Sequence, residues 1–270
     1  MDRILVIGSS GLSGKDFIER YSDKYLIDEI SRINVDTIID LVKNNEYKAV
    51  VYCAMSREYK NPIMDEDVLK VQITQINDIL KYSKRIENFI LFSTGSVYEM
   101  KGEIIEIDSP FVSKKVNPYQ ASKLMSELLV KTYENKIDSI NIVRPFYIFG
   151  SGQRNEMVFK TMLNKIVNDE EIVINNDGGM LFNPIHVEYC SRFIDDIIQK
   201  PKLGINEFIL SGDETITLKE IIETLSKELG KTSAIKENGN PLVKCVANSN
   251  IEFGFKMDLS SKILEMIIDK

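Results

Sequence analysis

The chain has 270 residues, 43% of them hydrophobic and 28% charged, and a formal net charge of −7. This length accommodates one large domain or two unequal ones around a real core. The acidic balance, with no basic run to offset it, argues against a nucleic-acid binder. The three cysteines, Cys53, Cys190 and Cys245, form no CxxC pair, which indicates reduced thiols of the cytoplasm and neither a disulfide framework nor a zinc site.

The termini and the remaining composition narrow the class further. The few residues ahead of the first apolar strand are too short for a signal peptide, and no apolar run approaches the roughly 20 residues that cross a bilayer. We therefore expect a cytoplasmic protein without membrane contact. His186 is the single histidine and no dense carboxylate cluster accompanies it, so we expect no metal site and a structural, buried role for His186.

The first motif is a glycine-rich loop behind an apolar strand. Residues 4–7 are continuously apolar, as in a strand buried on both faces of a parallel sheet. Gly8, Gly11 and Gly14 follow and a helix begins there, so the loop and the helix N-terminus can cradle a pyrophosphate. The spacing is GxxGxxG and not the standard GxGxxG of dinucleotide sites. A tight turn between strand and helix is the alternative.

The second strand, from about residue 25 to 30, ends at Ser31 and Arg32. An acidic side chain at this position bonds the ribose hydroxyls of NAD, whereas an arginine pairs with the 2′-phosphate of NADP. Arg32 lies in the right region and Asp28 competes with it. The sequence thus favours NADP and leaves NAD open.

Strands and helices then alternate, which predicts an α/β fold with a Rossmann-type doubly wound parallel sheet. The expected elements are a helix at 36–45, a strand at 48–54, a helix at 66–82, a strand at 89–92, a helix from 118 and a strand at 140–143. Hydroxyl residues follow the 89–92 strand. The carboxyl ends of such strands face the ligand crevice, so these hydroxyls are expected near an active site.

Tyr119 and Lys123 are four apart in a helix that Asn117 and Pro118 are suited to begin. They therefore share one helix face. An ammonium beside a phenol favours the phenolate and should lower the pKa of Tyr119, giving a proton-transfer group. A partly exposed helix face without function is the alternative.

After residue 145 the rhythm changes to shorter elements, with helices near 157–167, 187–199 and 218–229 and a late strand of the main sheet at 207–210. We expect a smaller C-terminal α/β substrate-binding domain. The predicted dinucleotide-binding domain comprises 1–150 plus about 184–211, and the predicted substrate domain about 151–183 plus 212–270.

At this point the sequence resembles the extended short-chain dehydrogenase/reductase family, the NAD(P)-dependent epimerases, dehydratases and reductases of nucleotide sugars. The resemblance rests on GSSGLSG at 8–14, AVVYCA at 49–54, FILFSTGSVYE at 89–99, YQASK at 119–123, RPFYIFGSGQ at 144–153, NPIHV at 183–187 and LSGDETITLKEI at 210–221. The order and spacing of these motifs, more than any one of them, are specific to the family.

The resemblance implies a role for each matching residue. Thr94, Tyr119 and Lys123 match the catalytic set, in which Lys123 holds the nicotinamide ribose, Tyr119 moves a proton and Thr94 orients the substrate oxygen. The residues implied for the cofactor are Gly8, Ser10, Gly11, Leu12, Gly14, Arg32, Cys53, Ala54, Met55, Gln72, Ser93, Tyr119, Lys123, Pro145 and Phe146. The residues implied for the substrate are Gly95, Ser96, Tyr147 and Arg154.

Departures from the family pattern restrict the reaction. The acidic residue that follows the catalytic Thr in dehydratases is Gly95 here, which disfavours sugar dehydration. Gln72 replaces a helix Asn and Tyr147 the Asn of the RPFN segment. Phe182 replaces an Arg that can hold the nucleotide diphosphate, and Tyr189 an Asp.

We therefore predict a ketoreductase acting on a nucleotide-linked keto-deoxysugar. An epimerase with tightly held NAD and a non-catalytic dinucleotide-binding regulator are the alternatives. A homodimer is expected from the resemblance. The sugar, the nucleotide and the stereochemistry stay open.

Overall fold

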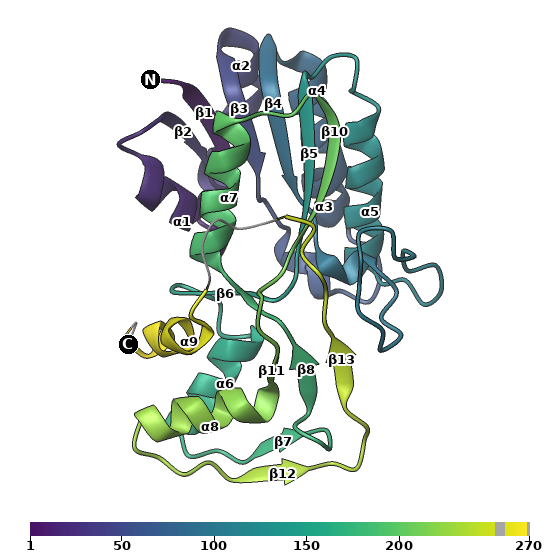
Figure 1. Ribbon diagram of the computed structural model, residues 1–270. Helices are drawn as coiled ribbons and strands as arrows, with labels where there is room; N and C mark the ends of the chain where they lie inside the picture. Colours follow the sequence, from purple (N-terminus) through teal and green to yellow (C-terminus); the bar gives the residue numbers. More distant parts are fainter. Residues whose placement is uncertain (252–256, 269–270) are drawn as a thin grey trace. The chain divides into compact units, whose positions relative to one another are not determined.

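A computed structural model describes residues 1–251 and 257–268 (Figure 1). The chain divides into two compact units. The first comprises Met1–Glu99, Pro110–Pro145 and Glu188–Phe208, and the second Met100–Ser109, Phe146–Val187 and Ile209–Lys270. The division differs from the expected one mainly in segment 100–109, which the sequence assigned to the first domain and which belongs to the second unit.

A six-stranded sheet forms the centre of the first unit, in the order β10-β5-β4-β3-β1-β2. Its strands are β1 Arg3–Ile7, β2 Leu26–Ile30, β3 Glu46–Tyr52, β4 Arg85–Phe92, β5 Ser139–Pro145 and β10 Gly204–Leu210. The strands from β2 to β5 pair in parallel, with Leu5 opposite both Asp28 and Val50. The strand order reverses between β1 and β3, which is where sheets of this kind bind ligands.

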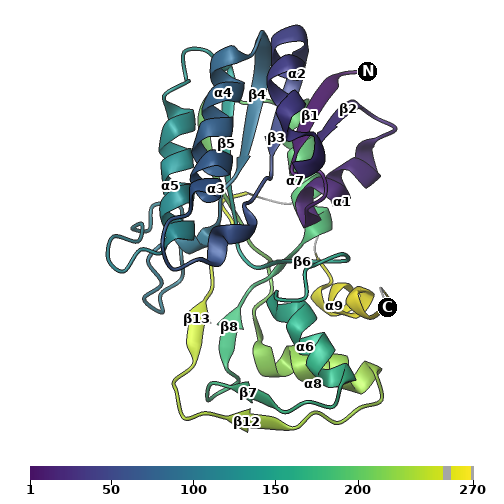
Figure 2. The ribbon, with the colours of Figure 1, turned by 180° about the vertical axis from the view of Figure 1, so that it is seen from behind.

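Helices cover both faces of the sheet, as predicted for a doubly wound fold. α1 (Leu12–Tyr21) and α7 (Val187–Gln199) lie on the face toward the viewer in Figure 1. α2 (Ile38–Asn44), α4 (Gln75–Tyr82) and α5 (Pro118–Lys131) lie on the opposite face, which Figure 2 shows in front. On that second face the fully buried Val50 and Phe89 of the sheet pack in one cluster with Ile79 and Val130 of the helices, and this burial is the main force that holds the layers together.

The expected helix at 66–82 is interrupted. α3 (Glu66–Leu69), begun by the Asp65 cap, passes into a π-helical turn at Lys70–Thr74 before α4 starts. Such a turn is rare and is frequently found at functional sites. Single turns of 3₁₀-helix also occur at Arg57–Lys60 and Gly95–Val97, and a longer 3₁₀ segment at Arg32–Thr37 replaces the start of the helix expected at 36.

The second unit consists of short strands and three helices in its described part. Its strands are β6 Ile148–Phe149, β7 Ile172–Ile174, β8 Met180–Phe182, β9 Ile185–His186, β11 Ile216–Thr217, β12 Ile235–Glu237 and β13 Val243–Cys245, and its helices α6 Val158–Val167, α8 Leu218–Glu228 and α9 Leu259–Ile268. β8 pairs with β11 and β13, β7 with β12 and β6 with β9. α8 packs against α6 and α9.

The described residues lack a membrane-spanning helix and a metal-binding cluster. No helix in 1–251 or 257–268 is long and apolar enough to cross a bilayer. The same part of the chain contains no group of three or more His, Cys, Asp or Glu side chains arranged to hold a metal ion.

Candidate active site

The glycine-rich loop after β1 is built on two close backbone approaches. Gly8 has φ of +93°, and a Cβ there would lie 2.7 Å from the backbone nitrogen of Ala54 behind β3. A Cβ on Gly14 would lie 2.4 Å from the carbonyl oxygen of Gly8. Side chains therefore fit at neither position, and the loop lies directly over the point where the strand order reverses.

This loop fits a dinucleotide pyrophosphate. Gly11 is the N-cap of α1. It has no side chain that could accept a hydrogen bond from the amides of the first turn. The first turn, which begins at Leu12, contains no acidic residue to repel an anion, and Ser10 is exposed beside it. A helix N-terminus of this kind offers N–H donors and a positive dipole end to a phosphate.

Asp28 and Arg32, the two residues that could contact the ribose of a cofactor, have different surroundings. Asp28 accepts hydrogen bonds from Arg3 Nε at 2.7 Å, on the neighbouring strand β1, and from the Tyr47 hydroxyl at 2.7 Å, on β3 beyond it. Its carboxylate is thus bonded to side chains of the sheet. Arg32 is exposed just beyond the end of the strand.

Gln72, in the π-helical turn, is fully buried, and its Nε2 donates to the carbonyl of Ala54 at 2.9 Å. Its Oε1 has no hydrogen-bond partner among the described residues. Buried acceptors normally receive a hydrogen bond. We therefore expect a donor group of a bound ligand to reach the Gln72 Oε1 atom, which lies next to the segment after β3. Cys53 and Met55, also predicted for the cofactor, flank Ala54 and are partly buried.

The sequence begins α5 in the way that Asn117 and Pro118 predict. The Asn117 side chain accepts from the Gln120 amide at 2.9 Å, and the Gln120 side chain accepts from the Asn117 amide at 3.1 Å, which completes a capping box. Gln120 Nε2 also donates to the carbonyl of Ser96 at 2.8 Å. The helix start is therefore fixed to the turn that follows β4.

Two of the three predicted catalytic residues are neighbours. The Thr94 side chain lies close enough to the Tyr119 phenol to lower its pKa, and the ring of Tyr59 contacts Tyr119 edge-on with 5.5 Å between centroids. Burial raises the pKa of Tyr119 to about 12, against the smaller lowering effect of Thr94. The prediction that Lys123 lowers this pKa is thus wrong for the structure as it stands, because desolvation of the phenolate dominates.

Lys123 is almost completely buried, and its Nζ donates to the Phe92 carbonyl at 2.9 Å. Burial lowers its pKa to about 8, while the nearby Cys53 and Glu127 raise it. The ammonium is therefore at the end of β4, one helical turn from Tyr119. A protonated phenol, a hydroxyl beside it and an ammonium one turn away are a set that can deliver a proton to a substrate oxygen.

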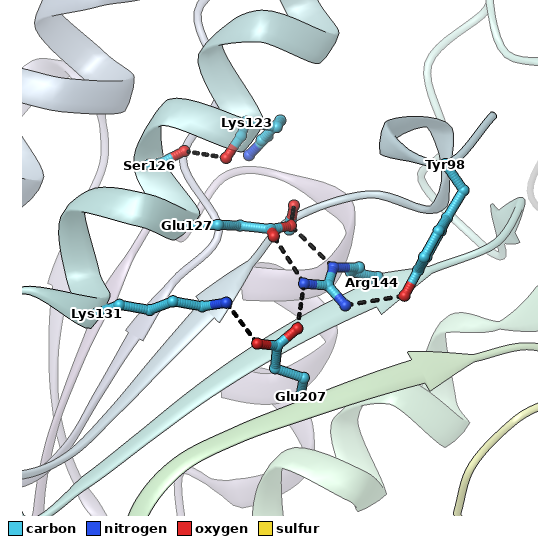
Figure 3. Close-up of polar contacts among 8 residues, drawn as sticks. Tyr98, Lys123, Ser126, Glu127, Lys131, Arg144 and Glu207 are labelled. Carbon is cyan, nitrogen blue, oxygen red and sulfur yellow. Dashed lines mark hydrogen bonds and ion pairs between the residues drawn. The ribbon is translucent and has the colours of Figure 1, made fainter. Parts of the chain in front are cut away.

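A cluster of buried charges beneath this set was not predicted (Figure 3). The Arg144 guanidinium donates to the Glu127 carboxylate at 3.0 and 2.7 Å, to Glu207 at 2.5 Å and to the Tyr98 hydroxyl at 2.9 Å. The pKa of Arg144 is raised by these carboxylates against the effect of its burial. The motif RPF contains Arg144, but its partners are distant in sequence, so no local pattern reveals the cluster.

The Ser93 hydroxyl donates to Glu127. Because the hydroxyl is engaged in this bond, we expect Ser93 to contact a cofactor through its backbone. Gly95 is buried and the partly buried Ser96 donates from its amide to Thr94 Oγ1 at 3.2 Å. These two predicted substrate residues belong to the first unit.

The other predicted site residues follow β5 and lie mainly in the second unit. Pro145 ends β5, and the Phe146 amide donates to the Leu210 carbonyl at 2.8 Å. Tyr147 has a left-handed φ of +48°, contacts the Phe182 ring at 4.9 Å between centroids, and its hydroxyl meets the Cys245 thiol. Two positions at which the family carries polar residues are thus occupied by aromatic rings in contact. Arg154 is exposed, 3.9 Å from Glu156.

His186 is buried, with its ring edge-on to Phe149 at 5.2 Å between centroids. Its Nε2 lies 3.6 Å from a carboxylate oxygen of Glu265 in α9. The burial expected from its apolar neighbours is confirmed.

The sequence matches the model of one protein family, described as the NAD dependent epimerase/dehydratase family, over residues 4–210. Among curated relatives, the protein named uncharacterized UDP-glucose epimerase YtcB of Bacillus subtilis is 25% identical over 152 residues, which are 56% of this chain. The match spans about half, 47%, of that relative's length. A dTDP-4-dehydro-6-deoxyglucose reductase of Escherichia coli is 25% identical over 86% of this chain and 76% of its own.

The fold is also found in solved structures. The UDP-glucuronic acid 4-epimerase of Bacillus cereus, crystallised with UDP-glucuronic acid and NAD, superposes with a TM-score of 0.84 over 99% of this chain and 98% of that one, at 19% identity. At this identity the comparison shows that the two chains share a fold. The chemistry must be argued from the residues of this chain.

Proposed function

The chain belongs to the NAD dependent epimerase/dehydratase family, and on that premise we propose that it is an NAD(P)-dependent reductase of a keto group on a nucleotide-linked deoxysugar. The observation that carries the proposal is the arrangement of Thr94, Tyr119 and Lys123. The Thr94 side chain lies beside the phenol and lowers its pKa, and Lys123 follows one turn later on the same face of α5.

The proton is delivered by the side chains of this chain. Because the pKa of Tyr119 is about 12, the phenol is protonated at neutral pH and acts as the proton donor to the oxygen of the reduced carbonyl. Thr94 donates to the same oxygen and orients it. Lys123 holds the nicotinamide ribose in this proposal. The dinucleotide supplies the hydride when bound, so the protein mainly positions two partners.

The end of β2 supports NADP as the proposed cofactor. Asp28 is bonded to Arg3 and Tyr47, which leaves the exposed Arg32 as the nearest charged side chain beyond Ile30. A guanidinium there favours the 2′-phosphate of NADP. The B. cereus structure was solved with NAD, and NAD is the alternative cofactor.

The proposed substrate is a nucleotide sugar, which is the class of molecule named for the relatives described above. Gly95, Ser96, Tyr147 and Arg154 are the residues proposed to contact it. Gly95 in place of an acidic residue after Thr94 leaves no carboxylate there for proton abstraction, which argues for reduction over dehydration.

The second candidate is a nucleotide-sugar epimerase with retained NAD. The sequence similarity to the B. subtilis relative named a UDP-glucose epimerase favours it. An epimerase returns the hydride to its own substrate and needs no external reductant. Recovery of purified protein with stoichiometric NAD, and conversion of a nucleotide sugar without net oxidation of NADPH or NADH, would favour this candidate.

The test begins with native mass spectrometry of the protein with NAD, NADP and UDP-, GDP-, dTDP- and CDP-linked sugars, followed by turnover assays with the keto sugars that bind. Tyr119→Phe is expected to lower kcat by at least ~10²-fold while dinucleotide binding persists. Tyr133→Phe is the matched control, because within the described residues that hydroxyl bonds Asn77 alone. Failure to bind either dinucleotide would refute the proposal. Equal turnover of the two variants would refute the role of Tyr119, and unchanged biological activity of Tyr119→Phe with dinucleotide binding intact would favour a non-catalytic regulator.

We also propose a homodimer that assembles through α5 in the cytoplasm. The side of α5 away from the sheet exposes two large apolar residues, Met125 at 42% and Leu128 at 66%, and contiguous apolar surface of this kind marks an interface. All three cysteines are free thiols, as in a reducing compartment. Sedimentation should give twice the mass of the chain for the wild type and the mass of one chain for Leu128→Glu.

A further inference from the structure

The carboxyl end of β4 contacts the catalytic helix at both of its predicted catalytic residues. The Phe92 carbonyl accepts from Lys123 Nζ at 2.9 Å. Two residues further along the chain, the Thr94 side chain lies close enough to Tyr119 to lower the pKa of its phenol. The reacting groups therefore lie where the end of the strand meets the helix, and their spacing depends on how α5 is placed along β4.

Ser93, the residue between these two contacts, makes a third one. Its hydroxyl donates to Glu127, one turn beyond Lys123. Positions 119, 123 and 127 lie on one face of α5 because they are four apart. The last residue of β4 and the two residues after it thus lie against three turns of the helix, and the proposed reaction has no use for the Ser93–Glu127 contact.

The Glu127 carboxylate is itself held from the far side (Figure 3). Arg144 of β5 donates to both of its oxygens, at 3.0 and 2.7 Å. Both side chains are buried, Glu127 at 2% and Arg144 at 0% exposure. A buried carboxylate that accepts two hydrogen bonds is fixed in one position, because rotation of the side chain would leave a desolvated charge unpaired.

We propose that Ser93 and Glu127 are positioning residues, which fix α5 on the carboxyl end of β4 so that Thr94 and Tyr119 meet, with Arg144 holding the Glu127 carboxylate. This inference rests on the proposed proton transfer for its effect on turnover. A displacement of about 1 Å at reacting groups can cost ~10²-fold in rate. The contact next to Thr94 is where such a displacement is prevented.

Glu127 also acts on Lys123 through its charge. The groups that face the Lys123 ammonium are Cys53, from the end of β3, and Glu127, from α5 itself. Burial lowers the pKa of Lys123 to about 8. Cys53 and Glu127 act in the opposite direction and raise this pKa. Glu127 therefore helps to keep the ammonium charged at neutral pH, in addition to fixing the helix.

The first test compares two buried serines. Ser93→Ala removes the contact between strand and helix, whereas Ser126→Ala removes only bonds within α5, to the carbonyls of Ser122 at 2.8 Å and Lys123 at 3.0 Å. We expect Ser93→Ala to lower kcat roughly tenfold, with little change in KM for the dinucleotide, and Ser126→Ala to leave both constants unchanged. Ser93→Thr keeps a hydroxyl and should recover much of the loss. Equal effects of the two alanine variants, or no recovery, would overturn the proposal.

The second test needs no substrate and so stays decisive if the proposed function fails. Carbon-13 NMR of lysine-labelled protein, with Lys123→Arg to assign the signal, should show Lys123 titrating near pH 8 in the wild type and at lower pH in Glu127→Gln. An unchanged midpoint would refute the role of Glu127. Should Glu127→Gln not fold, amide hydrogen exchange decides, since Ser93→Ala is expected to speed exchange in α5 and Ser126→Ala is not.

Discussion

Replacing Arg144 by Met tests how much the buried charge cluster contributes to stability. The guanidinium is fully buried and makes two hydrogen bonds to Glu127, one to Glu207 and one to Tyr98. Met keeps much of the length of the side chain and removes its charge. Glu127 is then left at 2% exposure without its main partner.

The expected loss follows from burial. Removing one partner of a buried ion pair costs roughly 3–5 kcal/mol. For a chain of this size each kcal/mol lowers Tm by about 2–4 °C, so Arg144→Met should lower Tm by about 6–20 °C. Arg192→Met is the matched control. Its side chain is 44% exposed and pairs with Glu188, and such a pair contributes at most about 1 kcal/mol.

Thermal unfolding followed by circular dichroism measures both variants. The double variant Arg144→Met with Glu127→Leu adds a further comparison, because it leaves no buried unpaired carboxylate. It should be more stable than Arg144→Met alone, since well-packed apolar pairs replace buried ion pairs at little cost. A Tm of Arg144→Met no lower than that of Arg192→Met would refute the reasoning, as would a double variant less stable than the single one.

Three further outcomes concern the proposed cofactor site. Binding is measured by titration with the reduced dinucleotides NADPH and NADH, whose nicotinamide fluoresces, and Tm by circular dichroism. Gly14→Ala should weaken dinucleotide binding by at least roughly tenfold, because its Cβ would lie 2.4 Å from a carbonyl oxygen of the loop, and Gly11→Ala, at 3.2 Å, should weaken it less. Arg32→Ala should lower the affinity for NADP relative to NAD, whereas Asp28→Asn should lower Tm and leave that ratio unchanged. Because the pKa of Lys123 is about 8, its ammonium is present below that pH and lost above it, so affinity should be constant near neutral pH and fall as the pH rises through 8.

The sequence by itself determined the framework of the first unit. Alternating apolar runs and amphipathic helices predicted the doubly wound sheet and the late strand β10, and the helix start at Asn117 and Pro118 is confirmed to the residue. These features depend on local periodicity and capping, which neighbouring residues define. The family resemblance, built from ordered motifs, is confirmed as well.

The tertiary structure decided which groups meet. Asp28 and Arg32 look equivalent in sequence, and only the strand order shows that Asp28 is bonded to β1 and β3. The pKa of Tyr119 rises because of burial, which a helix spacing does not report. The two-residue strands of the second unit depend on partners far along the chain.

The Tyr119–Lys123 pair illustrates the same division. The separation of four residues predicted that both side chains lie on one face of a helix. That Ser93 and Glu127 join the same face to β4, with Arg144 behind them, follows from residues up to 51 positions apart (144 − 93) that only the fold brings together. Local sequence specifies which side of a helix a residue occupies, and long-range packing specifies what stands opposite to it.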